Sequence, residues 1–313
     1  MTNKTNLTLW GRRFCVGVSL LLAAAIFTGC GGEKKGQKEY EEGMAFFTVQ
    51  QYESAVKQFA AAANLGHAEA QNKLGDCFFE GKGVSKDATE AVKWYRKAAE
   101  QDLAEAQFNL GLCYAKGIGV SKDAAEAVKW YRKAAEQGNA EAQVALGIYY
   151  YEGLGDSKDA AEAVKWFRKA AEQGLAVAQF NLGICYNTGN GVSKDVVEAV
   201  KWYRKAAEQG DTYAQCNLGI CYDTGNGVSK DEIEAVKWYR KAAEQGNADA
   251  QYHLGFCYNQ GKGVTADGKE ANKWIRKAAE QGHAAAKEYV RKMDELNEKV
   301  RYLGSGEWIN IPD

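Results

Sequence analysis

Residues 104–138 read AEAQFNLGLCYAKGIGVSKDAAEAVKWYRKAAEQG, and close variants of this stretch recur along most of the chain. The recurrence has a strict period, because six tryptophans and six glutamines each stand 36 residues apart. They are Trp94, Trp130, Trp166, Trp202, Trp238 and Trp274, and Gln71, Gln107, Gln143, Gln179, Gln215 and Gln251. A fixed period of roughly 20 to 50 residues indicates stacked structural units, each burying its apolar face against its neighbours.

The first half of the quoted unit predicts a helix that ends in a loop. Ala106, Leu110 and Tyr114 recur at intervals of four residues, which is the apolar seam of an amphipathic helix. The following segment, residues 117–122, contains two glycines and no apolar periodicity. We therefore predict a first helix and a connecting loop in each unit.

The second half of the unit predicts another helix with marked ends. Asp123 and Glu126 have the spacing of a helix-capping box, and an apolar and aromatic helical stretch follows them. Gly138 then predicts a left-handed C-terminal cap, a role that Asp102 takes in the preceding unit. Because every unit repeats these signals, the chain is predicted to be all-α, with about fifteen helices arranged as pairs.

The repeat also resembles a known family. The pattern Ala-x-x-x-Leu-Gly-x-x-Tyr, Gly-x-Gly-Val-x-x-Asp and Ala-x-x-Trp-Tyr-x-Lys-Ala-Ala-x-x-Gly is similar to the Sel-one-like repeat (SLR) family, related to tetratricopeptide repeats. The resemblance covers six units over residues 67–282 and implies a right-handed α/α superhelical solenoid. Residues 39–66 have a loop four residues shorter and resemble a plain tetratricopeptide repeat. Residues 283–303 turn strongly charged, which suits a capping helix, and 304–313 form a tail.

The N-terminus has the organisation of a bacterial secretion signal. Three positive residues precede an apolar run of 14 residues, too short to span a bilayer comfortably, so residues 1–29 are interpreted as a signal peptide. The run ends in Phe27-Thr28-Gly29-Cys30, which resembles a lipoprotein lipobox, although leucine is usual where Phe27 stands. The resemblance implies cleavage before Cys30 and diacylation of that residue. Residues 30–38 then form a tether, and an ordinary cleaved signal peptide is the alternative.

Lipidation of Cys30 would decide where the protein resides. Each acyl methylene buried in a bilayer contributes about 0.8 kcal/mol, so several chains would anchor the protein firmly to the membrane. By analogy with enterobacterial sorting, Gly31 in place of aspartate implies the outer membrane. We expect a lipid-anchored protein of the bacterial cell envelope that faces the periplasm.

Composition argues against a nucleic-acid partner. The formal net charge is −1, and removal of Lys4, Arg12 and Arg13 with the signal lowers it by three, to −4. A basic stripe does not follow from this balance. We therefore expect no nucleic acid among the partners.

Cysteine is the residue type that most invites a chemical interpretation. Five units have cysteine at one repeat position, namely Cys77, Cys113, Cys185, Cys221 and Cys257. Equivalent positions in stacked repeats lie on the order of 10 Å apart, beyond the roughly 7 Å Cα separation that a disulfide allows. We interpret these residues as small buried side chains. Cys216 lies on a different helix face, and a bond to Cys185 or Cys221 remains an open alternative.

Other motifs do not assemble a reactive site. The Gly-x-Gly loops connect helices and lack the preceding strand that a phosphate loop requires. The serines have no matching histidine partner, and no Cys/His group has metal-ligand spacing. We therefore expect no catalytic residues, no metal and no cofactor.

Binding residues are expected on the first helices. In tetratricopeptide-like arrays three first-helix positions face the concave groove, and here they differ between units. The position nearest the loop becomes polar toward the C-terminus, beside apolar and aromatic neighbours, which suits recognition of a protein or peptide segment. The alternative is that the other two positions only pack against adjacent helices. The predicted groove residues are Phe108, Leu112, Tyr151, Phe180, Asn187, Asp223, Tyr252, Phe256 and Asn259.

Together these features predict a non-enzymatic scaffold or adaptor that holds a protein or peptide partner in the cell envelope. The alternative is a cell-wall enzyme or binder, because penicillin binding and β-lactamase activity have been attributed to disulfide-rich members of the family. Those members pair cysteines within each repeat, whereas a single cysteine recurs here. Free thiols would therefore favour the scaffold, and paired ones would favour the alternative.

Overall fold

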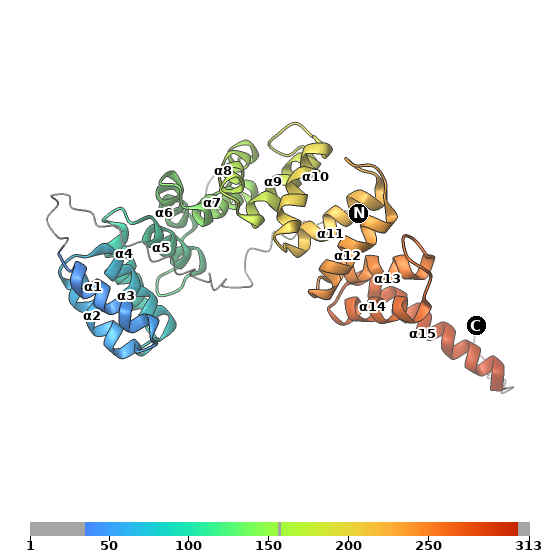
Figure 1. The fold of residues 1–313 in the computed structure, drawn as a ribbon, viewed down its shortest axis with the longest axis horizontal. Helices are drawn as coiled ribbons and strands as arrows, with labels where there is room; N and C mark the ends of the chain where they lie inside the picture. The colour runs from blue at the N-terminus through green and yellow to red at the C-terminus, as the bar shows by residue number, and fades with distance from the viewer. Residues whose placement is uncertain (1–34, 156–157, 306–313) are drawn as a thin grey trace. The chain divides into compact units, whose positions relative to one another are not determined.

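Every secondary-structure element of the described chain is an α-helix (Figure 1). The computed structural model describes residues 35–155 and 158–305. The helices are α1 (Gln37–Thr48), α2 (Tyr52–Asn64), α3 (Ala68–Glu80), α4 (Ala88–Ala99), α5 (Ala104–Lys116), α6 (Ala124–Glu136), α7 (Ala140–Glu152), α8 (Ala160–Glu172), α9 (Ala176–Thr188), α10 (Val196–Glu208), α11 (Thr212–Thr224), α12 (Glu232–Glu244), α13 (Ala248–Gln260), α14 (Gly268–Glu280) and α15 (Ala284–Ser305). The predicted all-α class with about fifteen helices is therefore confirmed.

The helices pack in chain order within two compact units. Unit 1 is Met1–Trp166 and unit 2 is Phe167–Asp313, with the boundary inside α8. In unit 1, each helix from α1 to α6 packs on the next one, and in unit 2 the same holds from α9 to α14. Odd-numbered helices from α3 to α13 are the first helices of the predicted repeats, and even-numbered ones from α4 to α14 are the second helices. Consecutive packing of helix pairs confirms the predicted α/α solenoid.

A glycine in the first helix allows the two helices of a repeat to approach closely. A Cβ atom on Gly111 of α5 would stand 2.8 Å from the Tyr131 ring of α6, closer than carbon atoms pack. The same contact recurs between Gly43 and Phe59, Gly75 and Tyr95, Gly183 and Tyr203, Gly219 and Tyr239, and Gly255 and Ile275. The glycine of the repeated Leu-Gly pair is thus needed for the two helices of a repeat to pack closely.

The core is built from residues that recur at fixed places in the repeat. Leu110 and the leucines equivalent to it are fully buried, and burial of each contributes roughly 2 kcal/mol. Small alanines such as Ala127 of α6 fill the contact between neighbouring helices. These leucines are Leu74, Leu110, Leu146, Leu182, Leu218 and Leu254.

Helix ends follow the predicted capping signals. The Asp123 carboxylate accepts hydrogen bonds from the backbone N–H groups of Ala125 and Glu126, which begins α6. Asp87, Asp159, Asp195, Asp231 and Asp267 cap the other second helices in the same way. Gly138 has φ +93° and Asp102 has φ +61°, as a left-handed cap requires. Each such N-cap contributes about 1 kcal/mol.

The recurring glutamine ties adjacent repeats together. Gln107 of α5 donates a hydrogen bond from Nε2 to the carbonyl of Ala99, at the end of the preceding second helix, at 3.2 Å. Its Oε1 accepts one from Gln137, which follows α6, at 2.8 Å. The donation to a carbonyl recurs at Gln71, Gln143, Gln179, Gln215 and Gln251. A single buried side chain therefore contacts both neighbouring second helices.

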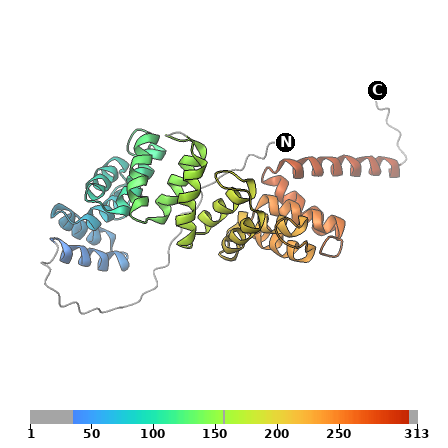
Figure 2. The same cartoon turned by 90° about the horizontal axis from the view of Figure 1, so that it is seen from above.

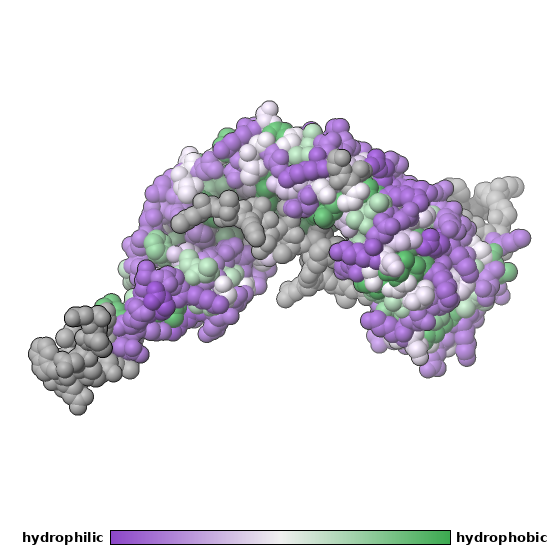
Figure 3. All heavy atoms as spheres, turned by 180° about the vertical axis from the view of Figure 1, so that it is seen from behind, coloured by the Kyte–Doolittle hydropathy of each residue, from purple (hydrophilic) through white to green (hydrophobic). Residues whose placement is uncertain are grey.

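The C-terminal helix α15 occupies the region predicted to be a capping helix, residues 283–303. It packs on α14 at its beginning, and its later part extends away from α13 and α14 (Figure 2). Side chains at 294–298 are exposed, and the surface seen in Figure 3 is largely hydrophilic with small hydrophobic areas. Four of these five residues are polar or charged, whereas Leu296 is 55% exposed, and the capping role stays a prediction.

The predicted signal peptide, Cys30 and the tail beyond residue 305 lie outside the described residues. Among the described helices, none combines the length and apolar character needed to cross a membrane.

Candidate binding surface on the first helices

The predicted groove residues of unit 1 are half-buried. Phe108 packs against the Tyr131 ring with their centroids 5.8 Å apart, and Leu112 lies one turn further along α5. Tyr151 near the end of α7 has the Lys158 ammonium 5.7 Å from its ring centroid. These three side chains therefore combine packing contacts with partial exposure.

Phe180 in unit 2 belongs mainly to the core. It is 9% exposed and lies in one cluster with Ile184 and Tyr203. Its ring also contacts that of Tyr213, at 6.0 Å between centroids. Tyr213 is 42% exposed, so it is the accessible part of this aromatic pair.

The position nearest the loop forms a polar row in unit 2. This row consists of Asn187, Asp223 and Asn259, in the last turns of α9, α11 and α13. Asn187 accepts a hydrogen bond from the Asn226 side chain at 3.4 Å, and Asn259 accepts one from the Tyr289 hydroxyl at 3.3 Å. Asp223 forms no hydrogen bond or ion pair with any described residue. The row thus has one free carboxylate between two engaged amides.

An aromatic cluster lies beside this row. Tyr252 stacks on His283 at 4.6 Å and contacts Phe256 at 6.2 Å, measured between ring centroids. His253, next to Tyr252, stacks on Tyr239 at 5.1 Å. Burial lowers the pKa of His253 below its ordinary value, and therefore its ring is neutral near pH 7. Tyr252 and Phe256 are half-buried, so part of each ring is accessible to a partner.

The second residue of each first helix makes contacts between repeats but was not among the predicted groove residues. Tyr213 reaches Phe180 of the preceding repeat, and Asp249 reaches His283 of the following one, with its carboxylate 3.3 Å from Nε2. In unit 1 the equivalent Glu105 forms an ion pair with Lys73 at 3.3 Å. Variation at this position was the available signal, because glutamate stands there in the first three repeats and valine, tyrosine and aspartate stand there in the next three.

The first repeat has a polar network where the others have apolar side chains. Asp76 of α3 accepts hydrogen bonds from the Tyr95 hydroxyl at 2.9 Å and from Lys73 at 3.3 Å. Nearby, Asn72 accepts one from the Asn109 side chain at 3.1 Å. Burial raises the pKa of the Asp76 carboxyl, and the Lys73 charge acts in the opposite direction. The network ties α3 to α4 and α5 through polar contacts.

A matched pair of tyrosines gives a testable consequence of this network. Tyr131 occupies the place of Tyr95 one repeat later, but its buried hydroxyl has no hydrogen-bond partner among the described residues. Tyr131→Phe should raise the free energy of unfolding by about 1 kcal/mol, since an unsatisfied polar group is removed. Tyr95→Phe should lower it by about 1–2 kcal/mol, because Asp76 loses a donor. Urea denaturation of both variants measures the difference, and a loss of stability in Tyr131→Phe would contradict the assignment.

The described cysteines behave as packing residues. All six are free and buried, which confirms the predicted role of the recurring position and leaves Cys216 without a disulfide: Cys77, Cys113, Cys185, Cys216, Cys221 and Cys257. Burial raises the pKa of Cys216 and Cys185 to about 12 and that of Cys113 to about 11. Such thiols react slowly, because the thiolate is the reactive form. The paired cysteines expected of the enzyme alternative are absent from the described chain.

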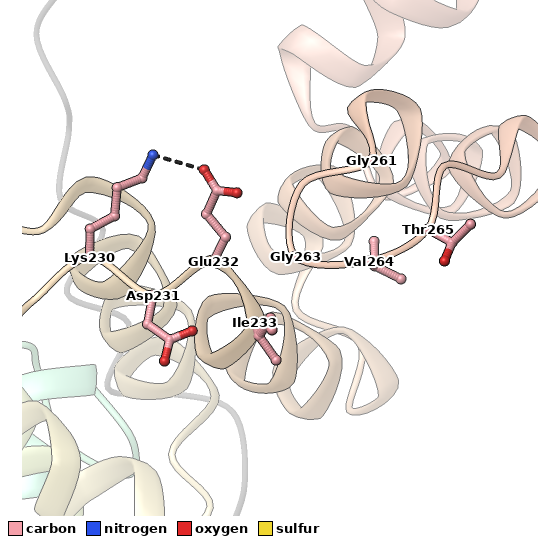
Figure 4. Close-up of a pocket in the computed structure, with 8 residues that line it drawn as sticks. All are labelled: Lys230, Asp231, Glu232, Ile233, Gly261, Gly263, Val264 and Thr265. Carbon is pink, nitrogen blue, oxygen red and sulfur yellow. Dashed lines mark ion pairs between the residues drawn. The ribbon is translucent and has the colours of Figure 1, made fainter.

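A shallow surface depression of about 770 Å³ lies where two loops meet in unit 2 (Figure 4). It is bordered by Ile233 at the start of α12 and by Val264 and Thr265 of the next loop. Lys230 and Glu232 form an ion pair at its edge, with 2.8 Å between the charged atoms. The depression is lined by loop backbone and by side chains of two successive repeats. We therefore interpret it as the gap between their loops and not as a ligand site.

Comparison with known proteins identifies the family. The Sel1 repeat matches residues 68–103, 104–139, 140–175, 176–211, 212–247 and 248–283. Since these matches cover more than half of the sequence, the chain belongs to the Sel1 repeat family. Such repeats are typical of protein–protein interaction scaffolds.

Two solved structures show the same fold. The crystal structure of c5321, a protective antigen of uropathogenic Escherichia coli strains displaying an SLR fold, is 39% identical, with a TM-score of 0.75 over 80% of this chain and 55% of that one. This chain thus spans little more than half of the c5321 structure. A Sel1 repeat protein from Oxalobacter formigenes is 40% identical, with a TM-score of 0.71 over 77% of this chain and 96% of that one. The comparison with curated proteins gave no match.

Proposed function

We propose that this Sel1 repeat protein is a non-enzymatic scaffold of the bacterial cell envelope that binds a partner protein through its first helices. One observation supports this most directly. Core positions such as that of Leu110 are identical in all six repeats, whereas the first-helix surface positions change from unit to unit. This variation includes an accessible mixture of aromatic and polar side chains, which suits selective recognition of a protein segment.

The predicted contact residues are distributed over both units. In unit 1 they are Phe108, Leu112 and Tyr151, and in unit 2 the accessible ones include Asp223 and Tyr252. Aromatic rings supply apolar contact area, and the amide and carboxylate groups supply directional hydrogen bonds. These side chains are suited to binding a partner, and such binding involves neither a catalysed reaction nor a cofactor.

Crosslinking in intact cells, followed by purification and mass spectrometry, tests the scaffold role. A dominant partner should be recovered reproducibly, with crosslinks that map to first-helix residues such as Lys73 and Lys116 or to α15. These lysines lie on α3 and α5, whereas most other lysines of the repeats lie on second helices and report on the opposite surface. Recovery of abundant unrelated proteins alone, without a reproducible partner, would contradict the scaffold role.

The membrane anchor is a separate part of the proposal. Cys30→Ala should shift the protein from the membrane fraction to the soluble fraction, because acylation at this residue supplies the membrane affinity. Cell fractionation followed by immunoblotting measures the shift. Cys77→Ala is a suitable control, since that thiol is buried in the repeats. Unchanged membrane retention of the Cys30 variant would argue for an ordinary signal or another means of attachment.

A further inference from the structure

Formal charges in unit 2 are segregated between the two kinds of helix. The first helices α9, α11 and α13 contain no lysine or arginine, and their only formal charges are the carboxylates of Asp223 and Asp249. The second helices α10, α12 and α14 each contain one arginine and at least two lysines. We call the surface formed by Asn187, Tyr213, Asp223, Asp249, Tyr252, Phe256 and Asn259 the first-helix face of unit 2.

Two lysines of each second helix have a partner on their own helix. Lys201 pairs with Glu198 at 2.8 Å, and Lys205 lies 4.0 Å from the Trp202 ring centroid. The equivalent pairs are Lys237 with Glu234, Lys241 with Trp238, Lys273 with Glu270 and Lys277 with Trp274. The arginines of α10 and α12 are also engaged, since Arg204 and Arg240 donate hydrogen bonds to the hydroxyls of Tyr222 and Tyr258. The first-helix face of unit 2 has no positive side chain from its own helices.

Asp223 occupies an unfavourable place for a carboxylate. It lies in the last turn of α11, where the partial negative charge of the helix C-terminus opposes an anionic side chain. Neither an ion pair nor a hydrogen bond with a described residue offsets this repulsion. Lys230 is the nearby cation, and its charge interacts with that of Asp223, but its ion pair is with Glu232 at 2.8 Å. Equivalent positions on either side are the neutral Asn187 and Asn259.

The surroundings of Asp223 would favour an incoming cation. Its half-buried position limits screening by water, so an ion pair there is stronger than one on an open surface. The accessible faces of Tyr252 and Phe256 on α13 provide contact area for the aliphatic stem of a long basic side chain. Asp249, with its side chain 62% exposed, adds a second negative charge on the same face. The amides of Asn187 and Asn259 add polar groups along the row.

We propose that the first-helix face of unit 2 binds a basic segment of the partner protein, with a lysine or arginine side chain paired to the Asp223 carboxylate. The assignment rests on the scaffold function proposed above and specifies the chemistry of the partner. Charge complementarity selects this class of partner, because an acidic segment would meet two carboxylates and no cation from α9, α11 or α13. Aromatic or aliphatic residues next to the basic one would contact Tyr213, Tyr252 and Phe256.

Asp223→Asn tests the assignment with little risk to folding. Asparagine already stands at the equivalent positions in α9 and α13, and the substitution removes an unfavourable charge from the end of α11. The matched control is Glu244→Gln, which removes one negative charge at the end of the second helix α12, where the side chain is exposed. Circular dichroism and thermal unfolding should show both variants folded like the wild type.

The probe is a random dodecapeptide library displayed on phage and selected on the purified full-length protein. Selected peptides should be enriched in lysine or arginine next to apolar residues. Fluorescence anisotropy with one such labelled peptide should show about tenfold weaker binding to Asp223→Asn and unchanged binding to Glu244→Gln. Raising NaCl from about 50 mM to about 500 mM should weaken binding to the wild type more than to Asp223→Asn.

The possible outcomes separate this assignment from the scaffold role. Selection of acidic or uncharged peptides, or equal binding by Asp223→Asn and the wild type, would overturn the basic-segment assignment. The scaffold role would survive that result if in-cell crosslinks still mapped to the first helices. If no peptide were selected and crosslinks mapped only to second helices, both proposals would fail.

Discussion

Gly119→Ala is expected to lower the free energy of unfolding by about 2–5 kcal/mol. Gly119 is the second glycine of the loop after α5, and its φ of +68° lies in the left-handed region, which costs an alanine roughly 1–2 kcal/mol. Its added Cβ would also stand 2.1 Å from the carbonyl oxygen of Ala88, at the start of α4. Because that neighbour is backbone, relief requires the loop to move off the preceding repeat, at a further cost of roughly 1–3 kcal/mol.

Gly138→Ala is the matched control for this prediction. Gly138 has φ +93°, but a Cβ there would meet no atom within 4 Å. Only the backbone strain remains, so a loss of about 1–2 kcal/mol is expected. Urea denaturation of the two variants compares them directly. Equal losses would show that close approach of the loop to α4 contributes nothing to stability.

Gln107→Leu should lower the free energy of unfolding by roughly 1–3 kcal/mol. The side chain is 0% exposed, and leucine has a similar volume, so the loss would come from hydrogen bonds and not from a cavity. The substitution removes the Gln107 donor to the Ala99 carbonyl, which keeps the hydrogen bond from the Asp102 backbone N–H, and it removes the acceptor of the Gln137 amide. A buried polar group that loses its partner costs about 1–3 kcal/mol.

Gln137→Leu provides the comparison for the glutamine contact. Its side chain is exposed and can be replaced by water, so a loss below about 1 kcal/mol is expected. Thermal or urea denaturation of the two purified variants gives the difference. A Gln107 variant as stable as the Gln137 variant would refute the coupling of repeats through this side chain.

The candidate site was only partly predictable from the sequence. The row of Asn187, Asp223 and Asn259 was found from position alone, because one helical repeat predicts the place of the next. How far each side chain is exposed depends on its neighbours. Phe180 is covered by Tyr203 and Tyr213, whereas Tyr252 on an equivalent position stays half-buried. The contribution of Tyr213 and Asp249 required knowing which residues of adjacent first helices meet.

The 36-residue period, the capping aspartates and the terminal glycines by themselves determine the helices, their ends and their pairing. These are local signals, since the backbone conformation and hydrogen bonds at a helix end depend on a few adjacent residues. Only the tertiary structure showed that Gln107 joins three helices, that Gly119 lies against α4, and that Asp223 has no partner among the described residues. The contacts of Gln107 with Gln137 and of Gly119 with Ala88 connect residues about thirty positions apart, and their geometry follows from how one repeat packs on the next.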